Sequence, residues 1–550
     1  MSWPNGKHTK KVRSSEGKKV RGGRDDGTFR PSPVRTFLPS SAVRPLVLVV
    51  LVVLGTALLA NSMTKEVGRD EQMYCTAGVL LGQGQTIYRD FSYPSQLPYH
   101  PLLLAALYRG LGTTHYLLVG RLASVVCDVL VMVFVLLLYR CIFGSHRRDG
   151  LLFGLAAATL HVFNPLVDYA AGYAWNHDVV ILCVIASLWL FVTTAFERRS
   201  RLWRVGMMGA LLTLATFMRV TTALIALLFL AVILYAADGP LRNRFRTALP
   251  FLAAALAVAL WPIWVMAQAP QAFWLNLVRI PALYGRWLHE IGRTFGKVAL
   301  TAEALMQPGY LVLLALGVYL AGTAWRQRAS WDRAERRQAA LAALLVLLLF
   351  VIAYIPPTIW HQYLAVPVPF VAIALAYPLV AMRRHADESS KRGPYRLTCG
   401  LVGAAAVIAV LTYPMVLQRC LFLAVPERWT PVELHRTSVK IAADIKEPGP
   451  VVTLGPLYAL EGGLEIYPEL SCGSIVYRVA DLMTEDERQI THTAGPEMLG
   501  KLVRDHPPAA VMLGVEPSYF AFLEEPLRRL VPADWRRDTY DNALQVYHRP

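Results

Sequence analysis

Residues 68–101, "GRDEQMYCTAGVLLGQGQTIYRDFSYPSQLPYHP", separate two long apolar stretches of the chain. These stretches, 44–62 and 115–139, each have a length in the range of roughly 17–25 residues that crosses a hydrocarbon core. The segment between them holds several charged side chains, including the adjacent pair Asp70 and Glu71. A loop that meets a bilayer with such residues is a candidate functional site, and its chemistry depends on which side of the membrane it faces.

The whole chain has the composition of a membrane protein. Of its 550 residues, 55% are hydrophobic and 17% are charged, whereas soluble domains carry about 25% charged residues. The stretch 205–238 is too long for one crossing and is interrupted by Arg219, which predicts two short spans or a re-entrant pair. The other apolar runs are 44–62, 115–139, 151–167, 179–196, 248–267, 308–325, 338–355, 362–381 and 398–417. We therefore expect an α-helical polytopic protein with about eleven transmembrane helices.

The basic residues orient the chain in the membrane, although the net charge of +17 at first suggests a nucleic-acid partner. Residues 1–43 form a basic tail that we expect to be disordered, with or without contact to anionic membrane lipids. Further basic clusters fall between the spans, at 147–148, 198–201, 242–246, 326–337 and 383–396. The positive-inside rule places the N-terminus and these clusters in the cytoplasm. We therefore predict no nucleic-acid partner.

The same alternation places four connections and the C-terminal segment on the outer face of a cytoplasmic membrane. The connections are 63–114, 168–178, 268–307 and 356–361. Residues 418–550 hold 14 Lys plus Arg against 19 Asp plus Glu. The segments "GPVVTLGP", "PAAVMLGVE" and "NALQVYH" are predicted strands, and 495–508 and 519–531 are predicted amphipathic helices. We expect a transmembrane domain over 44–417 and an extracytoplasmic mixed α/β domain over 418–550.

Residues 70–82 are predicted to form a helix along the membrane surface. Asp70 is the expected N-cap, an apolar stripe follows, and Gly82 is placed to end the helix. The apolar run 102–111 after it is too short to span the bilayer. For the carboxylates of Asp70 and Glu71 two roles remain open, either helix capping and solvation or proton transfer from a hydroxyl.

The first loop resembles that of the polytopic GT-C glycosyltransferases. The likeness is carried by the acidic pair after the first span, by "YCTAGVLLGQGQTIYRDF" and by the Pro-rich entry to the next apolar run. It continues in "LGTTHYLLVGRLASVVCDVLVMVFVLLLYRCIFG", "FNPLVDYAAGYAWNHDVVILCVIASLWLF" and "WHQYLAVPVPF". The chain is most similar to the family 39 and protein O-mannosyltransferase-like group, including the bacterial RgtA/B/C/D-like domain, over residues 44–381.

This resemblance implies transfer of a sugar from a polyprenyl phosphate donor to an acceptor hydroxyl at the outer leaflet. The acceptor is a lipid, a glycan or a protein. The family's first-loop acid maps onto Asp70, which is then expected to act as general base, while Glu71 helps to hold the acceptor or the donor. Tyr88 and Asp90 match the family's "Y.D" stretch, although a turn-stabilising Asp has the same appearance. A single displacement of this kind inverts the anomeric centre.

Cations around the phosphate leaving group are the second requirement of such a site. A buried Arg219 costs roughly 2.5–3.5 kcal/mol on insertion scales, so that a partner is expected unless the side chain snorkels to the interface. Arg279, Arg286 and Arg293 recur every seven residues, either to bind phosphates or to contact lipid head groups. His361 is a further cation candidate, and Tyr363 is either a substrate contact or part of an aromatic belt.

Polar residues inside or beside the spans have structural explanations as well. Asn176, His177 and Asp178 end the second outer connection, where related proteins place polar site residues, and where a helix cap is equally suitable. Arg121 and Asp128 lie seven residues apart in one span and are expected to stabilise helix packing. No metal ligand set is recognised and no cofactor is predicted, with a divalent cation left open. Three outward cysteines, Cys75, Cys420 and Cys472, are either free thiols or partners in a disulfide.

Two other classes of function remain open. A lipid or sugar transporter or flippase needs intramembrane charges along a path and related halves with broken helices, and the sequence shows few such charges and no symmetry. A non-catalytic assembly factor would use the outer domain as a binding module, and its outer-loop acids would then be indifferent to mutation.

Overall fold

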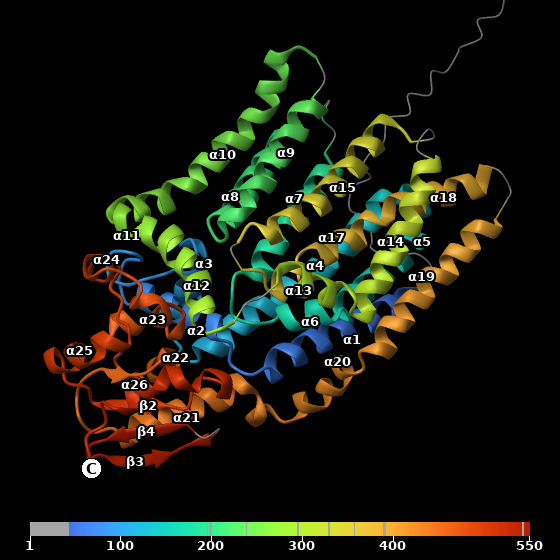
Figure 1. Ribbon diagram of the computed structural model, residues 1–550. Helices are drawn as coiled ribbons and strands as arrows, with labels where there is room; N and C mark the ends of the chain where they lie inside the picture. The colour runs from blue at the N-terminus through green and yellow to red at the C-terminus, as the bar shows by residue number, and fades with distance from the viewer. Residues whose placement is uncertain are drawn as a thin grey trace, which may run out of the picture.

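A computed structural model describes residues 43–194, 196, 201–237, 239–293, 296–327, 331–356, 358–388, 392–541 and 544–550. In this part of the chain a large helical bundle is joined to a small sheet-containing C-terminal domain at one end (Figure 1). The predicted tail 1–43 lies outside the described residues, except for Val43, as does the basic cluster 198–201 except for Arg201.

Seven described helical segments are long and apolar enough to cross a membrane. Their helices are α1 (Val43–Thr64), α4 (Tyr116–Ile142), α10 (Leu241–Gln268), α14 (Pro308–Gln327), α15 (Arg333–Tyr354), the run α16–α18 (His361–Ala365, Pro367–Ala374, Ala376–Glu388) and α19 (Gly393–Thr412). Shorter apolar helices include α7 (His177–Val192), α8 (Arg201–Thr216) and α9 (Ala223–Ala236). The predicted α-helical polytopic architecture is confirmed, while the number of eleven crossings stays a prediction.

The long apolar stretch around Arg219 is divided as expected. Helix α8 ends at Thr216, Arg219 has an extended backbone with φ −141° and ψ 109°, and a 3-10 turn over Val220–Thr222 leads into α9. The predicted division into two short apolar segments is confirmed, while their course as two spans or as a re-entrant pair stays a prediction. The break leaves Arg219 at the junction of the two helices instead of within one of them.

The basic clusters meet at one end of the bundle. Arg383 pairs with Asp149 at 2.8 Å, Arg384 pairs with Glu335, and Arg337 donates to the carbonyl of Ala236 at 2.9 Å. These contacts join four connections that the positive-inside rule places on one side. Two of the connections predicted on the other side, 63–114 and 268–307, lie beside the C-terminal domain at the other end of the bundle (Figure 1).

Short helices cover that second end of the bundle. They are α2 (Arg69–Gly82), α3 (Tyr99–Leu111), α6 (Pro165–Ala170), α11 (Pro270–Trp274), α12 (Ile280–Glu290) and α13 (Lys297–Leu305). A π-helical segment, Leu275–Arg279, joins α11 to α12. The helix predicted over 70–82 corresponds to α2, and the run that is too short to span corresponds to α3.

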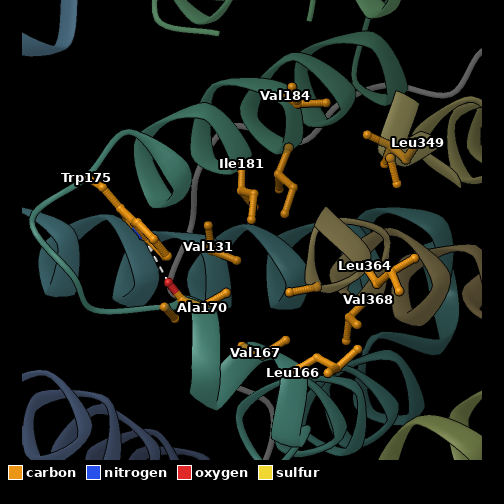
Figure 2. Packing of buried hydrophobic residues seen from close by; sticks show 14 of the residues in the cluster. Val131, Leu166, Val167, Ala170, Trp175, Ile181, Val184, Leu349, Leu364 and Val368 are labelled. Carbon is orange, nitrogen blue, oxygen red and sulfur yellow. Dashed lines mark hydrogen bonds between the residues drawn. The ribbon is translucent and has the colours of Figure 1, made fainter. Parts of the chain in front are cut away.

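The core between the bundle helices is formed by aliphatic side chains from distant segments. Figure 2 shows Val131 of α4, Ile181 of α7, Leu349 of α15 and Val368 of α17 facing one another, all nearly inaccessible to solvent. At the edge of this cluster Trp175 donates its indole N–H to the carbonyl of Ala170 at 3.0 Å. This hydrogen bond fixes the connection between α6 and α7, which carries several of the site residues.

The C-terminal domain contains a four-stranded sheet in the order β1-β2-β4-β3. The strands are β1 (Val451–Val452), β2 (Ala510–Leu513), β3 (Arg536–Thr539) and β4 (Gln545–His548). The β1–β2 pair is parallel and the other pairs are antiparallel. Three of these strands fall in the predicted segments, and β3 was not predicted. The surrounding helices are α21 (Thr430–Asp444), α22 (Pro456–Glu461), α23 (Ser474–Ala480), α24 (Glu485–Thr491), α25 (Leu499–Asp505) and α26 (Glu525–Arg528).

Candidate active site

The start of α2 differs from its prediction in a way that changes the role of its two acids. The helix begins at Arg69 with Gly68 as N-cap, so Asp70 is not the cap residue. Glu71, in the first turn, stabilises the start of the helix, because its Oε2 accepts from the backbone N–H of the N-cap residue Gly68 at 2.9 Å. The helix end is therefore stabilised without Asp70, whose side chain remains available for another function.

Glu71 and Arg121 form an ion pair that is completely buried. Arg121 donates from Nε and Nη2 to the two carboxylate oxygens of Glu71, each at 2.8 Å. Its other N–H groups donate to the carbonyls of Ser62, in the last turn of α1, and of Lys65 and Glu66, in the connection to α2. The backbone N–H of Ala174 completes the coordination of Glu71.

These contacts give Glu71 a structural role. Protein donors occupy both of its oxygens, so the expectation that Glu71 holds the acceptor or the donor has no support in this geometry. Arg121, which was expected to stabilise helix packing, contacts α2 through Glu71. The pair joins α4 to the connection 63–114 and thereby fixes the direction of α2.

Asp70 lies in a group of cations and tyrosines. Burial raises the pKa of Asp70, and the positive charges of Arg478, Arg69 and Arg219 oppose this rise. Tyr74, Tyr169, Tyr284 and Tyr363 are all within electrostatic reach of the Asp70 carboxylate. Among the residues that the structure describes, Asp70 forms no hydrogen bond or ion pair. A carboxylate that has no described hydrogen-bond partner and lies among cations and hydroxyl groups is suited to accept a proton from a bound ligand.

Arg219 approaches this carboxylate from the junction of α8 and α9. Its Nη2 donates to Oδ1 of Asn176 at 3.4 Å. The Nδ2 of Asn176 in turn donates to the side chain of Gln96 and to the carbonyl of Met218, each at 2.8 Å. Asn176 precedes α7 but makes no capping hydrogen bond with its side chain. Its amide contacts Arg219, which interacts electrostatically with Asp70. The carboxylate or lipid phosphate expected as the partner of Arg219 stays a prediction.

His177 and Asp178 open α7 and are both buried. Oδ2 of Asp178 accepts from the backbone N–H of Gly172 at 3.0 Å, and Asp128 lies close to its side chain. His177 lies within electrostatic reach of Arg219, with its ring near Trp175. Asp178 thus supports the connection between α6 and α7, whereas His177 adjoins the group around Asp70.

The C-terminal domain contributes a residue to the site that was missed in the sequence. Arg478 of α23 is 7% exposed, donates to the hydroxyl of Tyr284 at 2.8 Å and lies 4.7 Å from the centre of that ring. Arg69, also missed, stacks on Phe520 at 4.4 Å and pairs with Glu516 at 3.2 Å. Of these two arginines, only Arg69 could have been found in the sequence, because it directly precedes the candidate base Asp70.

The arginines spaced by seven do not form one row. Arg279 pairs with Glu487 of α24 at 3.0 Å, and Arg286 pairs with Glu290 at 2.9 Å on an exposed surface. Helix α12 ends at Glu290, and Gly292 has φ +70°, so Arg293 leaves the helix face. Of the three, Arg293 reaches the Phe520 ring, at 4.6 Å. The expected row of three arginines on one helix face is therefore wrong, because Arg293 lies beyond the helix.

Tyr88 and Asp90 stabilise the turn after α2. Tyr88 is buried with φ +68°, donates its hydroxyl to the carbonyl of Gln96 at 2.6 Å and packs against Phe273. Asp90 accepts from the backbone N–H of Thr86 at 2.6 Å and pairs with Arg89. These contacts favour the structural interpretation of the "Y.D" stretch.

His361 and Tyr363, which are neighbours in α16, have different surroundings. The imidazole of His361 lies 3.8 Å from Glu303 and packs edge-on against Tyr169. Tyr363 lies within electrostatic reach of Asp70, Arg219 and Tyr284. Of the two, Tyr363 is placed with the predicted site residues around Asp70.

The cysteines are free thiols in the structure, which removes the predicted alternative of a disulfide. Cys75 and Cys472 are buried, and the Cys472 thiol lies 3.0 Å from the carbonyl of Ser92. For metals, the described residues contain no group of three or more His, Cys, Asp or Glu side chains that is arranged to hold an ion.

The fold is shared with known membrane glycosyltransferases. A family model described as dolichyl-phosphate-mannose-protein mannosyltransferase matches residues 98–266. ArnT of Cupriavidus metallidurans, in a crystal structure with bound undecaprenyl phosphate, has a TM-score of 0.62 at 16% identity, over 92% of this chain and 98% of that chain. The oligosaccharyltransferase of Archaeoglobus fulgidus, tethered to an acceptor peptide, has a TM-score of 0.51 at 12% identity, over 92% of this chain and 74% of that chain. No curated protein matches the sequence.

These similarities define the fold of the protein. The chain has the fold of the GT-C polytopic glycosyltransferases, which confirms the resemblance found in the first loop. The family model covers the segment from the end of the first outer connection through α10. The C-terminal sheet domain follows the bundle and completes the group of residues around Asp70.

Proposed function

We propose that the protein transfers a sugar from a polyprenyl-phosphate-linked donor to an acceptor hydroxyl at the outer face of the cytoplasmic membrane. The observation that carries this proposal is the Asp70 carboxylate, which lacks a described hydrogen-bond partner and is surrounded by Arg69, Arg219 and Arg478. The similar ArnT structure contains undecaprenyl phosphate, which supports a lipid phosphate as the donor group. Hexosyl and pentosyl donors fit the proposal equally.

The chemistry follows from the charges around Asp70. The carboxylate takes the proton of the acceptor hydroxyl as the oxygen forms a bond to the anomeric carbon. The bond from that carbon to the phosphate oxygen breaks, and the polyprenyl phosphate leaves with the bonding electrons. Arg219 is positioned to stabilise the charge that develops on this phosphate. Since attack and departure occur in one displacement, the anomeric configuration is inverted.

The raised pKa of Asp70 suits a general base. A base is most effective when its pKa lies near the working pH, and burial moves the pKa of this carboxyl upward from its usual acidic value. The nearby arginines oppose the rise and keep the ionised form accessible. Tyrosine side chains around the carboxylate reduce its contact with water and thereby disfavour hydrolysis of the donor.

The transport alternative has less support from the charges inside the bundle. Arg121 is fully paired with Glu71 and three backbone carbonyls. Asp178 accepts from the backbone N–H of Gly172 and lies close to Asp128. Such contacts hold helices in place instead of lining a path for a polar solute.

The experiment is transfer from a radiolabelled polyprenyl phosphate sugar in membranes that contain wild-type or variant protein. Asp70→Asn is expected to lower the transfer rate by about 10²–10⁴-fold while the protein remains folded. Asp90→Asn removes a carboxylate from the same loop and serves as the matched control, with near-normal transfer. Wild-type rates with Asp70→Asn would refute the mechanism, and donor movement across vesicles without a covalent product would favour transport.

A further inference from the structure

Three guanidinium groups surround one aromatic ring at the boundary between the bundle and the C-terminal domain. Arg69, Arg293 and Arg478 lie 4.4, 4.6 and 5.9 Å from the ring of Phe520. They come from the start of α2, from the segment after α12 and from α23, three elements that Figure 1 shows close together. We call this group the Phe520 arginine cluster.

The Phe520 arginine cluster carries more positive charge than its protein partners neutralise. Arg69 pairs with Glu516. Arg478 instead donates to the neutral hydroxyl of Tyr284, and Arg293 donates to the backbone carbonyl of Tyr519 at 3.2 Å. Each cation–π contact offsets part of the charge. Cations that surround one ring nevertheless repel one another. The aromatic side chains strengthen this repulsion, because they lower the local dielectric constant.

Two charged N–H groups of the cluster are buried without a hydrogen-bond acceptor in the described protein. They are Nη2 of Arg69 and Nε of Arg478. A buried donor that bears charge loses its water contacts, and leaving it unpaired is unfavourable by more than the worth of an ordinary hydrogen bond. Such groups are common where a ligand supplies the acceptor. An anion with several oxygens would satisfy both donors.

This cluster is distinct from the arginine on the bundle side of Asp70. Arg219 is held by Asn176 at the junction of two apolar helices, where a polyprenyl chain lying in the membrane can present its phosphate. The Phe520 arginine cluster instead depends on the C-terminal domain for Arg478, Glu516 and Phe520. Asp70 interacts electrostatically with both Arg219 and Arg478.

We propose that the Phe520 arginine cluster binds an anionic group, a phosphate or a carboxylate, on the acceptor molecule. This proposal rests on the proposed sugar transfer and adds the chemical class of the acceptor. The anion anchors the acceptor against the C-terminal domain and so directs a neighbouring hydroxyl toward Asp70. The donor phosphate occupies the Arg219 side, and the two negative groups are kept apart by the Asp70 carboxylate.

The test uses the full-length protein in nanodiscs of phosphatidylcholine. Equilibrium binding of inorganic phosphate and of glucuronate is measured before and after saturation with undecaprenyl phosphate. We expect at least one anion to bind, with little change after the lipid is added. A preference for phosphate indicates a phosphorylated acceptor, and a preference for glucuronate indicates an acidic sugar.

Variants assign the binding to the cluster. Arg478→Gln and the less buried Arg293→Gln are each expected to weaken anion binding by about tenfold or more in the lipid-saturated protein. Arg219→Gln is expected to weaken undecaprenyl phosphate binding and to leave anion binding in place. Arg286→Gln, an exposed arginine of the same outer connection, is the control with unchanged binding.

Three results would overturn the proposal. These are no anion binding to the wild type, loss of anion binding on addition of undecaprenyl phosphate, and normal anion binding by Arg293→Gln together with a folded Arg478→Gln. If undecaprenyl phosphate itself does not bind but the anion does, the proposed donor is wrong and the anion site stands. The two proposals are therefore tested separately.

Discussion

Arg121 donates two hydrogen bonds of 2.8 Å to Glu71, and this contact separates the role of Glu71 from that of the adjacent Asp70. Neighbouring residues on an α-helix point about 100° apart. When Glu71 is held against α4, Asp70 is directed away from that helix and toward Arg219, Arg69 and Arg478. One acid of the pair therefore fixes the helix, and the other is left for the chemistry.

Loss of the Glu71–Arg121 pair is expected to destabilise the fold. Breaking a buried ion pair by removing one partner costs about 3–5 kcal/mol, because the remaining charge is left uncompensated. Glu71→Gln should therefore lower the unfolding temperature in detergent. The single variant Arg121→Lys should lower it as well, since Lys lacks the bidentate geometry. Asp70→Asn is the control, with a near-normal unfolding temperature. A stable Glu71→Gln protein with no transfer activity would instead place Glu71 in the chemistry.

The acid limb of the pH–rate profile is expected to depend on the arginines. Asp70 must be ionised to accept a proton, so kcat/KM falls as the pH drops through its pKa. Arg478 and Arg219 stabilise the ionised carboxylate, and replacing either with Gln raises this pKa further. The acid limb should then move to higher pH in Arg478→Gln and Arg219→Gln. A shift to lower pH, or the same shift in the distant Arg286→Gln, would contradict this assignment.

Thiol chemistry should leave the folded protein largely unaffected. Burial raises the pKa of Cys472 to about 12 and also raises that of Cys75, so both remain as unreactive thiols at neutral pH. We expect slow alkylation of these two residues in the native protein and rapid alkylation after denaturation, measured by mass spectrometry of peptides. A dithiothreitol-dependent change in unfolding temperature would reveal a disulfide and contradict the structure.

The orientation of the chain can be tested by labelling at two exposed positions. Gln83 follows α2, and Arg246 lies near the start of α10, at opposite ends of the bundle. In intact cells an impermeant maleimide is expected to label Gln83→Cys above the wild-type background and not Arg246→Cys. Lysed cells should label both. The reverse result would place Asp70 in the cytoplasm and remove the proposed lipid-linked reaction at the outer face.

Local sequence signals predicted the elements that depend on local physics. The helix over α2, the short α3 and the break at Arg219 follow from apolar periodicity and length. Asp70 was found by its position after the first span. The seven-residue spacing of Arg279 and Arg286 was misleading, because each forms an ion pair with a different glutamate.

The rest of the site depends on contacts between distant parts of the chain. Arg478 and Phe520 have no motif around them, and their place beside Asp70 results from packing of the C-terminal domain. That domain is held in part by Glu461, which accepts from the backbone N–H of Leu117 at 2.7 Å and pairs with His435 at 3.0 Å. Such long-range pairings leave no periodic trace in a single sequence.

The position of Arg478 has a consequence for biosynthesis. The ribosome delivers Asp70 with the first outer connection, long before it makes α23. A membrane-inserted bundle without the final segment would therefore contain Asp70 in a site that lacks Arg478. In the outer orientation that we propose, sugar transfer begins only after export of the C-terminal segment, and a chain that ends after α19 is expected to insert into the membrane without activity.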